Sequence, residues 1–245
     1  MIADVVKQTI GLVDILKVTG TAEETRIQGV DANKTLFIEA YLREPLSELS
    51  GEFGITNLNM LRGLLDFATY RTEKSTFSVK RMMIRDRDGE LNRETVEQFE
   101  FRDGTTGAGA DFRCMSPDRV PDQADIKNVP WDITIKPSKS KISEFQQLAS
   151  LYSDVDKNFG AKTENGNLLF FFGDDNSSTH RASMVFESGV EGSLNAGLQW
   201  SAAQLIQVLK LANSEGRIRI TSRGVLSVEV ETTHGSYKYF LRAMR

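Results

Sequence analysis

The chain has 245 residues, of which 40% are hydrophobic and 26% are charged, a balance that is normal for a globular protein and excludes a disordered one. That length suffices for one large domain or two ordinary ones. No apolar run approaches the roughly 20 residues that span a bilayer, and a single cysteine, Cys114, excludes an internal disulfide. We expect no signal peptide, no membrane association and a cytoplasmic location.

The formal net charge is -4, which by itself disfavours a protein that binds nucleic acid. However, 30 Lys and Arg residues stand beside 34 Asp and Glu residues, so a basic face can coexist with an acidic body. The positions of the basic residues therefore matter more than the total.

The first part of the chain predicts a helix, three strands and a second helix. Residues 5–18 place apolar side chains at spacings of three and four, and Gly20 follows as a stop. Residues 24–42 are typical of two strands around a turn at 31–33. Residues 52–55 indicate a third strand, and a helix begins near Asn57 with one apolar stripe: Leu58, Leu61, Leu64 and Leu65.

Alternating strands and a connector are predicted next. Residues 76–86, 91–103 and 109–115 have the period of two that is typical of a strand meander. The following segment contains Pro117, Pro121 and Pro130, which indicates an extended linker.

The second half repeats this order. It predicts a strand at 131–137, then an amphipathic helix at 138–155 with these inward residues: Ile142, Phe145, Leu148 and Leu151 or Tyr152. Three strands with a turn at Asn165-Gly166 follow over 157–188. A strand at 197–200 leads into a helix at 201–212, and three more strands fill 217–244.

Two distant stretches make the repetition visible. EFGITNLNMLRGLLDF (52–67) and GLQWSAAQLIQVLKLA (197–212) both run from a short strand into a helix. The sequence therefore predicts two copies of one α+β unit. We expect an N-terminal domain at 1–116, a connector at 117–130 and a C-terminal domain at 131–245.

The polar faces of the predicted helices are rich in basic residues and poor in acidic ones. The exceptions are Asp14, Asp66 and Glu144. Most acidic residues lie in the predicted strands and turns, which is the distribution of an acidic body with a mildly basic helical face. The alternative interpretation is that these are ordinary solvated helix faces. The basic positions on or next to the helices are Lys7, Lys17, Arg62, Arg71, Lys139, Lys141, Lys210 and Arg217.

The order of all these elements resembles the DNA polymerase sliding clamps. EFGITNLNMLRGLLDF resembles the strand and second helix of a clamp's first domain, and WDITIKPSKSKISEFQQL resembles the start of its last domain. The ending GVLSVEVETTHGSYKYFLRAM resembles the C-terminal hairpin. Two domains per chain imply the trimeric form, as in eukaryotic and archaeal clamps and those of T-even-type bacteriophages. The first helix and ADFRCMSPDRVPD are most similar to the phage clamps.

This resemblance implies a DNA-clamp fold in which each domain packs two helices on antiparallel sheets and three chains form a pseudo-sixfold ring. Duplex DNA would pass through the ring, and the eight basic residues named above would contact its phosphates without sequence preference. A replicative DNA polymerase and a clamp-loader ATPase are the implied partners. The resemblance implies no enzymatic activity, no cofactor and no metal.

Ring closure in this family pairs an edge strand of one chain with an edge strand of the next. By position these are residues 109–116 and 180–188. The alternative is that both edges face solvent. The implied interface residues are Ala110, Phe112, Cys114, Arg181, Ser183 and Val185.

Clamps also hold partner peptides in an apolar pocket beneath the connector. The alternative for Val30, Phe37 and Phe240 is a place in the core. The matching positions are Val30, Thr35, Phe37, Val129, Pro130, Gly224, Phe240 and Met244.

Other motifs carry weaker functional hypotheses. RDRDGEL (85–91) begins like a calcium loop but lacks the later glutamate, so a hairpin turn is favoured. GTTGAGA (104–110) has no following helix and is not a phosphate loop. Two alternatives to the clamp remain. One is a ring- or tube-forming phage structural protein, and the other is a metal-dependent enzyme that uses Asp174, Asp175 and His180.

Overall fold

The computed structural model describes residues 1–85, 91–121, 129–173, 180–195, 197–212 and 216–244. The chain divides into two compact units. Unit 1 contains Met1–Ala32, Ile38–Ala124 and Thr233–Ser236, and unit 2 contains Asn33–Phe37, Asp125–Thr232 and Tyr237–Arg245. Two short segments are exceptions to a simple division into halves. Asn33–Phe37 lies in the first half of the sequence but belongs to unit 2, and Thr233–Ser236 lies in the second half but belongs to unit 1.

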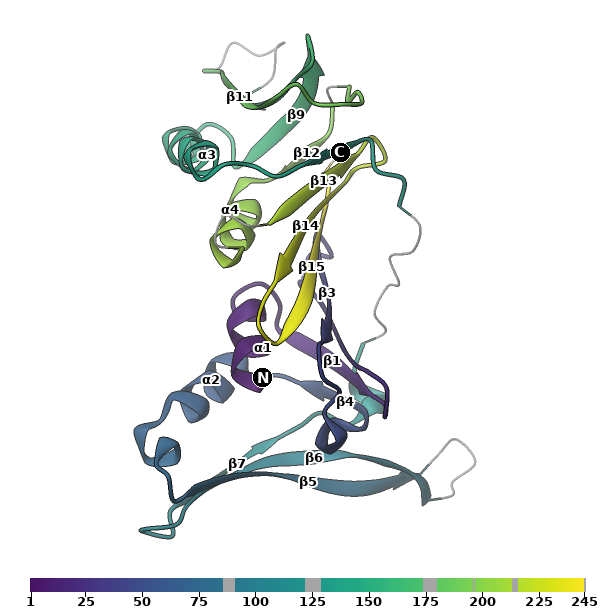
Figure 1. Cartoon of the computed structure of the whole chain (residues 1–245), viewed down its shortest axis with the longest axis vertical. Coiled ribbons are helices and arrows are strands. Elements are labelled where there is room, and N and C mark those ends of the chain that lie inside the picture. Colours follow the sequence, from purple (N-terminus) through teal and green to yellow (C-terminus); the bar gives the residue numbers. More distant parts are fainter. Residues whose placement is uncertain (86–90, 122–128, 174–179, 196, 213–215, 245) are drawn as a thin grey trace. The chain divides into compact units, whose positions relative to one another are not determined.

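Unit 1 contains two helices and two groups of antiparallel strands (Figure 1). The first group has the order β4-β1-β2-β3, and the second has the order β5-β6-β7. Short 3-10 turns occur at Ser47–Leu49, Ala68–Arg71 and Pro117–Arg119. The elements are α1 (Ile2–Thr9), β1 (Ile15–Gly20), β2 (Thr25–Val30), β3 (Leu36–Leu42), β4 (Gly51–Ile55), α2 (Leu58–Asp66), β5 (Ser75–Arg85), β6 (Leu91–Asp103) and β7 (Gly109–Arg113).

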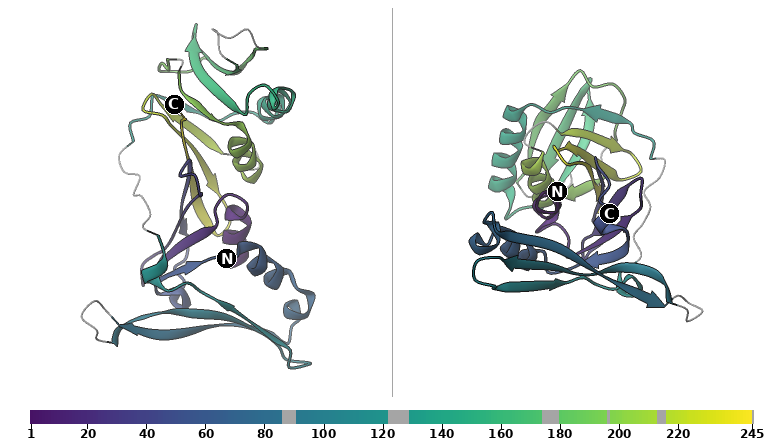
Figure 2. Two further views of the ribbon diagram at one scale, coloured as in Figure 1. Left: turned by 180° about the vertical axis from the view of Figure 1, so that it is seen from behind. Right: turned by 60° about the horizontal axis from the view of Figure 1, so that its bottom comes forward.

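Unit 2 repeats this plan with one additional strand at its start. Its strands form the orders β11-β10-β9-β12 and β15-β14-β13-β8. The helices α3 and α4 lie side by side, as α1 and α2 do in unit 1 (Figures 1 and 2). The elements are β8 (Ile133–Ile135), α3 (Lys139–Tyr152), β9 (Asn158–Glu164), β10 (Asn167–Phe172), β11 (Ala182–Ser188), β12 (Gln199–Ser201), α4 (Ala202–Leu211), β13 (Arg217–Thr221), β14 (Val225–Glu231) and β15 (Gly235–Arg242).

The two sheet orders correspond strand by strand. The sheet β4-β1-β2-β3 matches β12-β9-β10-β11, and β5-β6-β7 matches β13-β14-β15. The α+β architecture predicted from the sequence is confirmed, with four helices on antiparallel sheets. None of the helices in the described part of the chain is long and apolar enough to cross a bilayer.

The predicted helix at 5–18 is wrong over its second half. The helix α1 ends at Thr9, and Gly11 adopts φ 76, a left-handed conformation that glycine enters readily and that breaks an α-helix. Residues 15–20 then form β1, in which Leu16 and Val18 face the core. The β-branched Ile15 and Val18 favour this strand over the helix that the apolar spacing predicted.

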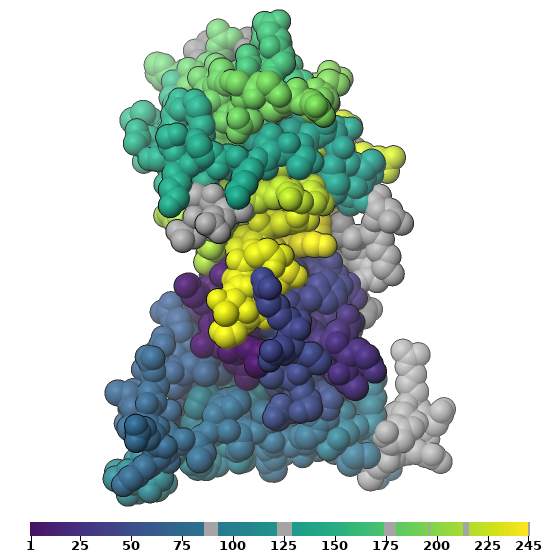
Figure 3. Space-filling model, viewed as in Figure 1, coloured from purple at the N-terminus to yellow at the C-terminus, as the bar shows by residue number. Residues whose placement is uncertain are grey.

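Aromatic side chains fill the core of unit 2. The ring of Phe145, which projects from α3, lies 5.0 Å from the ring of Phe159 and 5.4 Å from that of Phe170, centroid to centroid. Phe172 and Phe186 complete the cluster, each 6.0 Å from Phe145. The space-filling view shows the outer face of each unit, with the atoms closely packed (Figure 3). The aromatic core fixes α3 against its sheet.

The inward face of α3 differs in one turn from the prediction. Ile142 and Phe145 are buried as expected, but Leu151 is 77% exposed. Ala149 takes the inward position in this turn, because it follows Phe145 by four residues, one helical repeat later. Tyr152 is half-buried, and its hydroxyl donates a hydrogen bond of 2.8 Å to the carbonyl of Arg181.

Candidate nucleic-acid interface, strand edges and pocket

The helical face of unit 2 presents unpaired positive charge. Ser138 and Ser201 cap α3 and α4 by accepting hydrogen bonds from the backbone amides of Lys141 and Gln204. Between the helices lies a groove of about 450 Å³ that Lys210 lines from α4. Lys139 and Lys210 are exposed and form no ion pair with a described residue. Both ammonium groups are therefore available to an anionic ligand.

The helical face of unit 1 carries two similar cations. Lys7 on α1 and Arg62 on α2 are exposed, and neither forms an ion pair within the described part of the chain. Their neighbours on the same helices, such as Val6 and Leu61, are buried. The apolar stripe of each helix thus turns the basic residue toward solvent.

The other four predicted cations are paired. Lys141 contacts Glu144 at 2.8 Å. Arg71 contacts Asp66 at 3.9 Å and Arg217 contacts Glu229 at 3.9 Å, and all three ion pairs lie on the surface. Such pairs are weak, but they lower the net charge that a phosphate meets. The available charge is therefore smaller than the sequence suggested.

Lys17 is a correction to the predicted basic helix face. It lies in the middle of β1, on the side of the sheet away from the core, and pairs with Glu52 of β4. Arg93 approaches the same carboxylate at 2.5 Å. Burial raises the pKa of Glu52, but the hydrogen bonds from Lys17 and Arg93 outweigh burial and hold that pKa below its ordinary value. Asp14 likewise lies beyond the end of α1.

Both strands expected at the subunit interface occupy sheet edges. β7 is the last strand of β5-β6-β7, and β11 is the first strand of β11-β10-β9-β12. Each has one described neighbour, so one side of its backbone is open to another strand. The side chains of Ala110 and Val185 are half-buried, and those of Arg181 and Ser183 are exposed.

Phe112 and Cys114 differ in how far their side chains reach the surface, because Phe112 is buried and Cys114 is half-buried. Phe112 is 2% exposed, and its ring stacks on that of Phe99 at 6.1 Å, so it belongs to the core. Cys114 lies just after β7, and its amide donates to the carbonyl of Glu97 at 2.9 Å. Burial raises the pKa of the Cys114 thiol to about 12, which keeps it protonated and unreactive.

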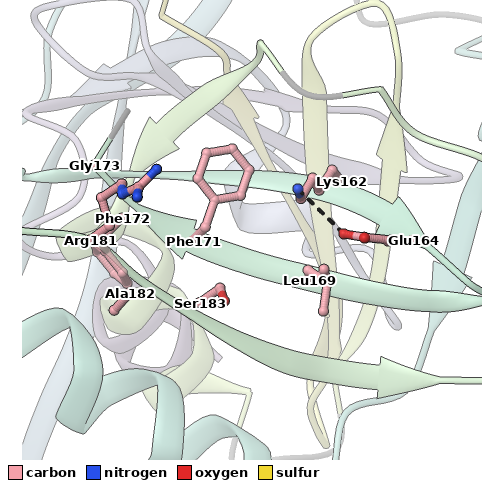
Figure 4. Close-up of a pocket in the computed structure, with 9 residues that line it drawn as sticks. All are labelled: Lys162, Glu164, Leu169, Phe171, Phe172, Gly173, Arg181, Ala182 and Ser183. Carbon is pink, nitrogen blue, oxygen red and sulfur yellow. Dashed lines mark ion pairs between the residues drawn. The ribbon is translucent and has the colours of Figure 1, made fainter. Parts of the chain in front are cut away.

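A groove of about 370 Å³ crosses the outer face of the sheet next to the β11 edge (Figure 4). Phe171 and Leu169 form its apolar floor, and Lys162 pairs with Glu164 at 3.4 Å along one side. The ring of Phe171 lies over Gly160, where a Cβ atom would come within 2.2 Å of it. Arg181 and Ser183 line the opposite side, so the predicted interface residues border this groove.

Two of the eight residues predicted for a peptide pocket, Thr35 and Gly224, line one pocket together. A pocket of about 540 Å³ in unit 2 includes Thr35 and Gly224, together with the turn residues that flank them. The amide of Arg242 donates to the carbonyl of Thr35 at 2.8 Å, and that of Ala243 donates to Gly224 at 2.7 Å. These bonds fix the end of β15 between the two turns. The whole lining is Asn33, Lys34, Thr35, Leu198, Ser222, Arg223, Gly224, Arg242 and Ala243.

The other predicted pocket residues do not line this pocket. Phe240 is a correction, because it is 6% exposed and packs in the core. Phe37, Val129 and Met244 are half-buried, and Pro130 is exposed. Val30 is half-buried and belongs to unit 1.

The chemistry of the pocket also differs from the apolar one that the resemblance implied. Lys34, Arg223 and Arg242 give it three cations, whereas Leu198 and Ala243 supply the apolar surface. These cations were not predicted from the sequence. A turn was predicted at 31–33, and the basic Lys34 beside it was the available signal.

The motifs for metal or phosphate binding find no support in the described residues. No group of three or more His, Cys, Asp or Glu side chains among them could hold a metal ion. Asp174 and Asp175, and the turn within RDRDGEL, lie outside the described residues. In GTTGAGA, the carboxylate of Asp103 accepts the amides of Thr105 and Thr106 at 3.1 and 3.0 Å. Those amides are therefore occupied and do not face a phosphate.

Comparison with known proteins gives a structural match without a sequence match. No protein-family model and no curated protein matches the sequence. The fold is similar to that of PCNA from Thermococcus kodakaraensis, with a TM-score of 0.67 and 13% identity over 99% of this chain and 96% of that one. It is also similar to a chain of the PCNA2-PCNA3 complex from Sulfolobus tokodaii, with a TM-score of 0.61 and 12% identity over 99% and 95%. The chain has the α+β DNA-clamp fold of these structures.

Proposed function

We propose that this protein is a sliding clamp, a processivity factor that encircles duplex DNA as a homotrimeric ring and tethers a replicative DNA polymerase. The observation that carries the proposal is the full-length match to PCNA structures combined with free cations on the helices of both units. Lys7, Arg62, Lys139 and Lys210 would contact phosphates without reading bases, which is the contact that a sliding protein needs.

The open strand edges support the ring. An antiparallel pairing of β7 in one chain with β11 in the next would use two edges that are open within one chain. Repeating the same heterologous contact around three chains would close the assembly. In this arrangement the interface side chains would be those of Ala110, Cys114, Arg181, Ser183 and Val185, whereas Phe112 stays in the core.

The pocket beside Thr35 and Gly224 would hold the partner peptide. Its three cations favour a peptide that presents a carboxylate, from an acidic side chain or a C-terminus, beside one or two apolar side chains. A polymerase is the proposed partner, and a clamp-loader ATPase would open the ring. The sequence features that resemble phage clamps favour a bacteriophage replication system as the setting.

Solution mass tests the ring. Light scattering across a dilution series is expected to give three times 27.4 kDa. The variant Val185→Asp places a carboxylate on the edge strand and is expected to yield monomers. Leu169→Asp is the matched control, because Leu169 faces Val185 on β10, one strand away from the edge, and is also half-buried. A wild-type monomer at high concentration would contradict the ring.

A topological experiment tests the DNA function and separates it from the alternative. A clamp loaded onto circular duplex should stay bound in high salt and dissociate when the circle is cut, because only encirclement depends on closed DNA. A ring- or tube-forming structural protein would instead grow beyond the trimer with concentration and show no difference between circular and linear DNA.

A further inference from the structure

The strand β5 has an open edge where its counterpart in unit 2 is covered. In unit 2, β8 pairs antiparallel with β13 and adds a fourth strand, with Ile133 opposite Ile220 and Ile135 opposite Ile218. In unit 1, β5 corresponds to β13 and pairs with β6 alone among the described strands (Figure 1). Among the described residues of unit 1, no strand takes the place beside β5 that β8 takes beside β13.

This open edge leaves apolar surface uncovered. Ile218 and Ile220, the inward side chains of β13, are both 0% exposed. Phe77 points inward from β5 in the same way, with its ring 5.6 Å from that of Phe99 and 5.2 Å from that of Phe101, yet it is 44% exposed. Ile218 and Ile220 have a strand on both sides, whereas Phe77 has a described strand on one side only.

A groove follows this uncovered side. It has a volume of about 410 Å³ and opens between β5, the start of α1, the 3-10 turn at Ser47–Leu49 and the end of α2. Its lining is mostly aliphatic or aromatic, with Glu48 and Ser78 as the polar members. The apolar side chains in it are Met1, Ile2, Leu46, Leu49, Leu65, Phe77 and Val79.

The charged groups of β5 are already satisfied by the neighbouring strand. Lys80 pairs with Glu97 at 3.0 Å, and Arg81 pairs with Glu94 at 3.0 Å. The guanidinium of Arg81 also donates to the carbonyls of Glu48 and Ser50. A ligand at this edge would therefore be selected by its apolar side chains and its backbone rather than by its charge.

We propose that the open edge of β5 binds an extended segment of a partner protein, which adds an antiparallel strand and inserts two alternate aliphatic side chains into the groove. The segment Ile133-Thr134-Ile135 on β13 is the internal example of such an occupant. All fifteen strands in the described part of the chain already lie in sheets, so none of them is left over to occupy this edge. Strand addition of this kind draws affinity from the main chain and specificity from alternate side chains.

A synthetic peptide can test this site on the full-length chain. The probe has the sequence of residues 131–138, WDITIKPS, and the readout is amide hydrogen exchange in β5. We expect saturating peptide to slow exchange of the outward amides of β5 about tenfold or more, because new cross-strand hydrogen bonds protect them. A control peptide with aspartate in place of both isoleucines should leave exchange unchanged.

Two variants locate the effect. Phe77→Asp is expected to abolish peptide protection, because it places a carboxylate in the apolar groove. Thr76→Asp is the matched control, because residue 76 points to the opposite face of β5 and is also exposed. Circular dichroism establishes that both variants fold before they are compared.

Each outcome decides the proposal. It is overturned if saturating WDITIKPS leaves exchange in β5 unchanged, or if Phe77→Asp and Thr76→Asp protect equally well. It is also overturned if β5 is protected without peptide and that protection grows with protein concentration, because a second copy then occupies the edge. The proposal is independent of ring formation, so a monomeric chain that protects β5 with peptide still supports it.

Discussion

Replacing Lys210 with alanine tests whether the helix faces bind DNA. Lys210 is exposed on α4, lines the groove beside α3 and forms no ion pair with a described residue. Each phosphate contact on duplex DNA contributes about 0.9 to the slope of log affinity against log salt. Loss of one contact per ring therefore reduces the slope by about 0.9, and loss of three contacts, one per chain, reduces it by about 2.7.

Those slopes convert to measurable ratios. Over a fourfold rise in salt, the wild-type affinity should fall between about 3.5-fold and about 40-fold more than that of Lys210→Ala. The assay is fluorescence anisotropy with a labelled duplex across a salt series, at protein concentrations where light scattering gives one assembly state.

The matched control is Lys162→Ala. It removes the same charge from unit 2, but Lys162 lies on the face of the sheet away from α3. Its slope should equal that of the wild type. Equal effects of Lys162→Ala and Lys210→Ala would refute the reasoning, because overall charge and not the helix face would then govern binding.

Three further predictions concern stability and reactivity. Phe145→Ala should lower the free energy of unfolding by about 3–5 kcal/mol in urea titrations, because Phe145 is 0% exposed among four aromatic rings. In the folded chain the pKa of Glu52 lies below its ordinary 4.5. The ionised carboxylate therefore stabilises the fold above pH 4.5, and this stabilisation is lost as the pH falls through the folded pKa. Glu52→Gln should lower the free energy of unfolding at neutral pH and make it depend less on pH in the acid range. Cys114 should resist maleimide at neutral pH until the chain is unfolded, because burial raises the pKa of its thiol to about 12, and rapid labelling of the folded chain would contradict this.

Much of the fold was predictable because its signals are local. The strand period over 91–103, the turn at Asn165-Gly166 and the stripe of Leu58 and Leu61 each depend on residues that are neighbours in sequence. The repeat was visible for the same reason, since each copy carries its own strand and helix patterns. By contrast, residues 10–18 had apolar spacing compatible with a helix, and the left-handed turn at Gly11 decided against it.

The site was less predictable, because charge availability depends on contacts between distant residues. The sequence identified eight basic positions, but it could not show that Glu52 neutralises Lys17 or that Glu229 lies beside Arg217. The same holds for the pocket, where Lys34 and Arg242 meet only after more than two hundred intervening residues have folded.

The α+β repeat follows from local patterns, and so does the exposure of four helical cations, because helical periodicity turns them away from the core. These cations are Lys7, Arg62, Lys139 and Lys210. Which strand edges stay open depends on long-range pairing. β7, β11 and β5 become edges because no other described strand pairs with their outer sides, and strand pairing joins residues that are remote in the chain. Burial of a side chain also depends on which strands pair around it. Phe240 is therefore in the core and Phe77 is exposed, although both are phenylalanines in alternating strands.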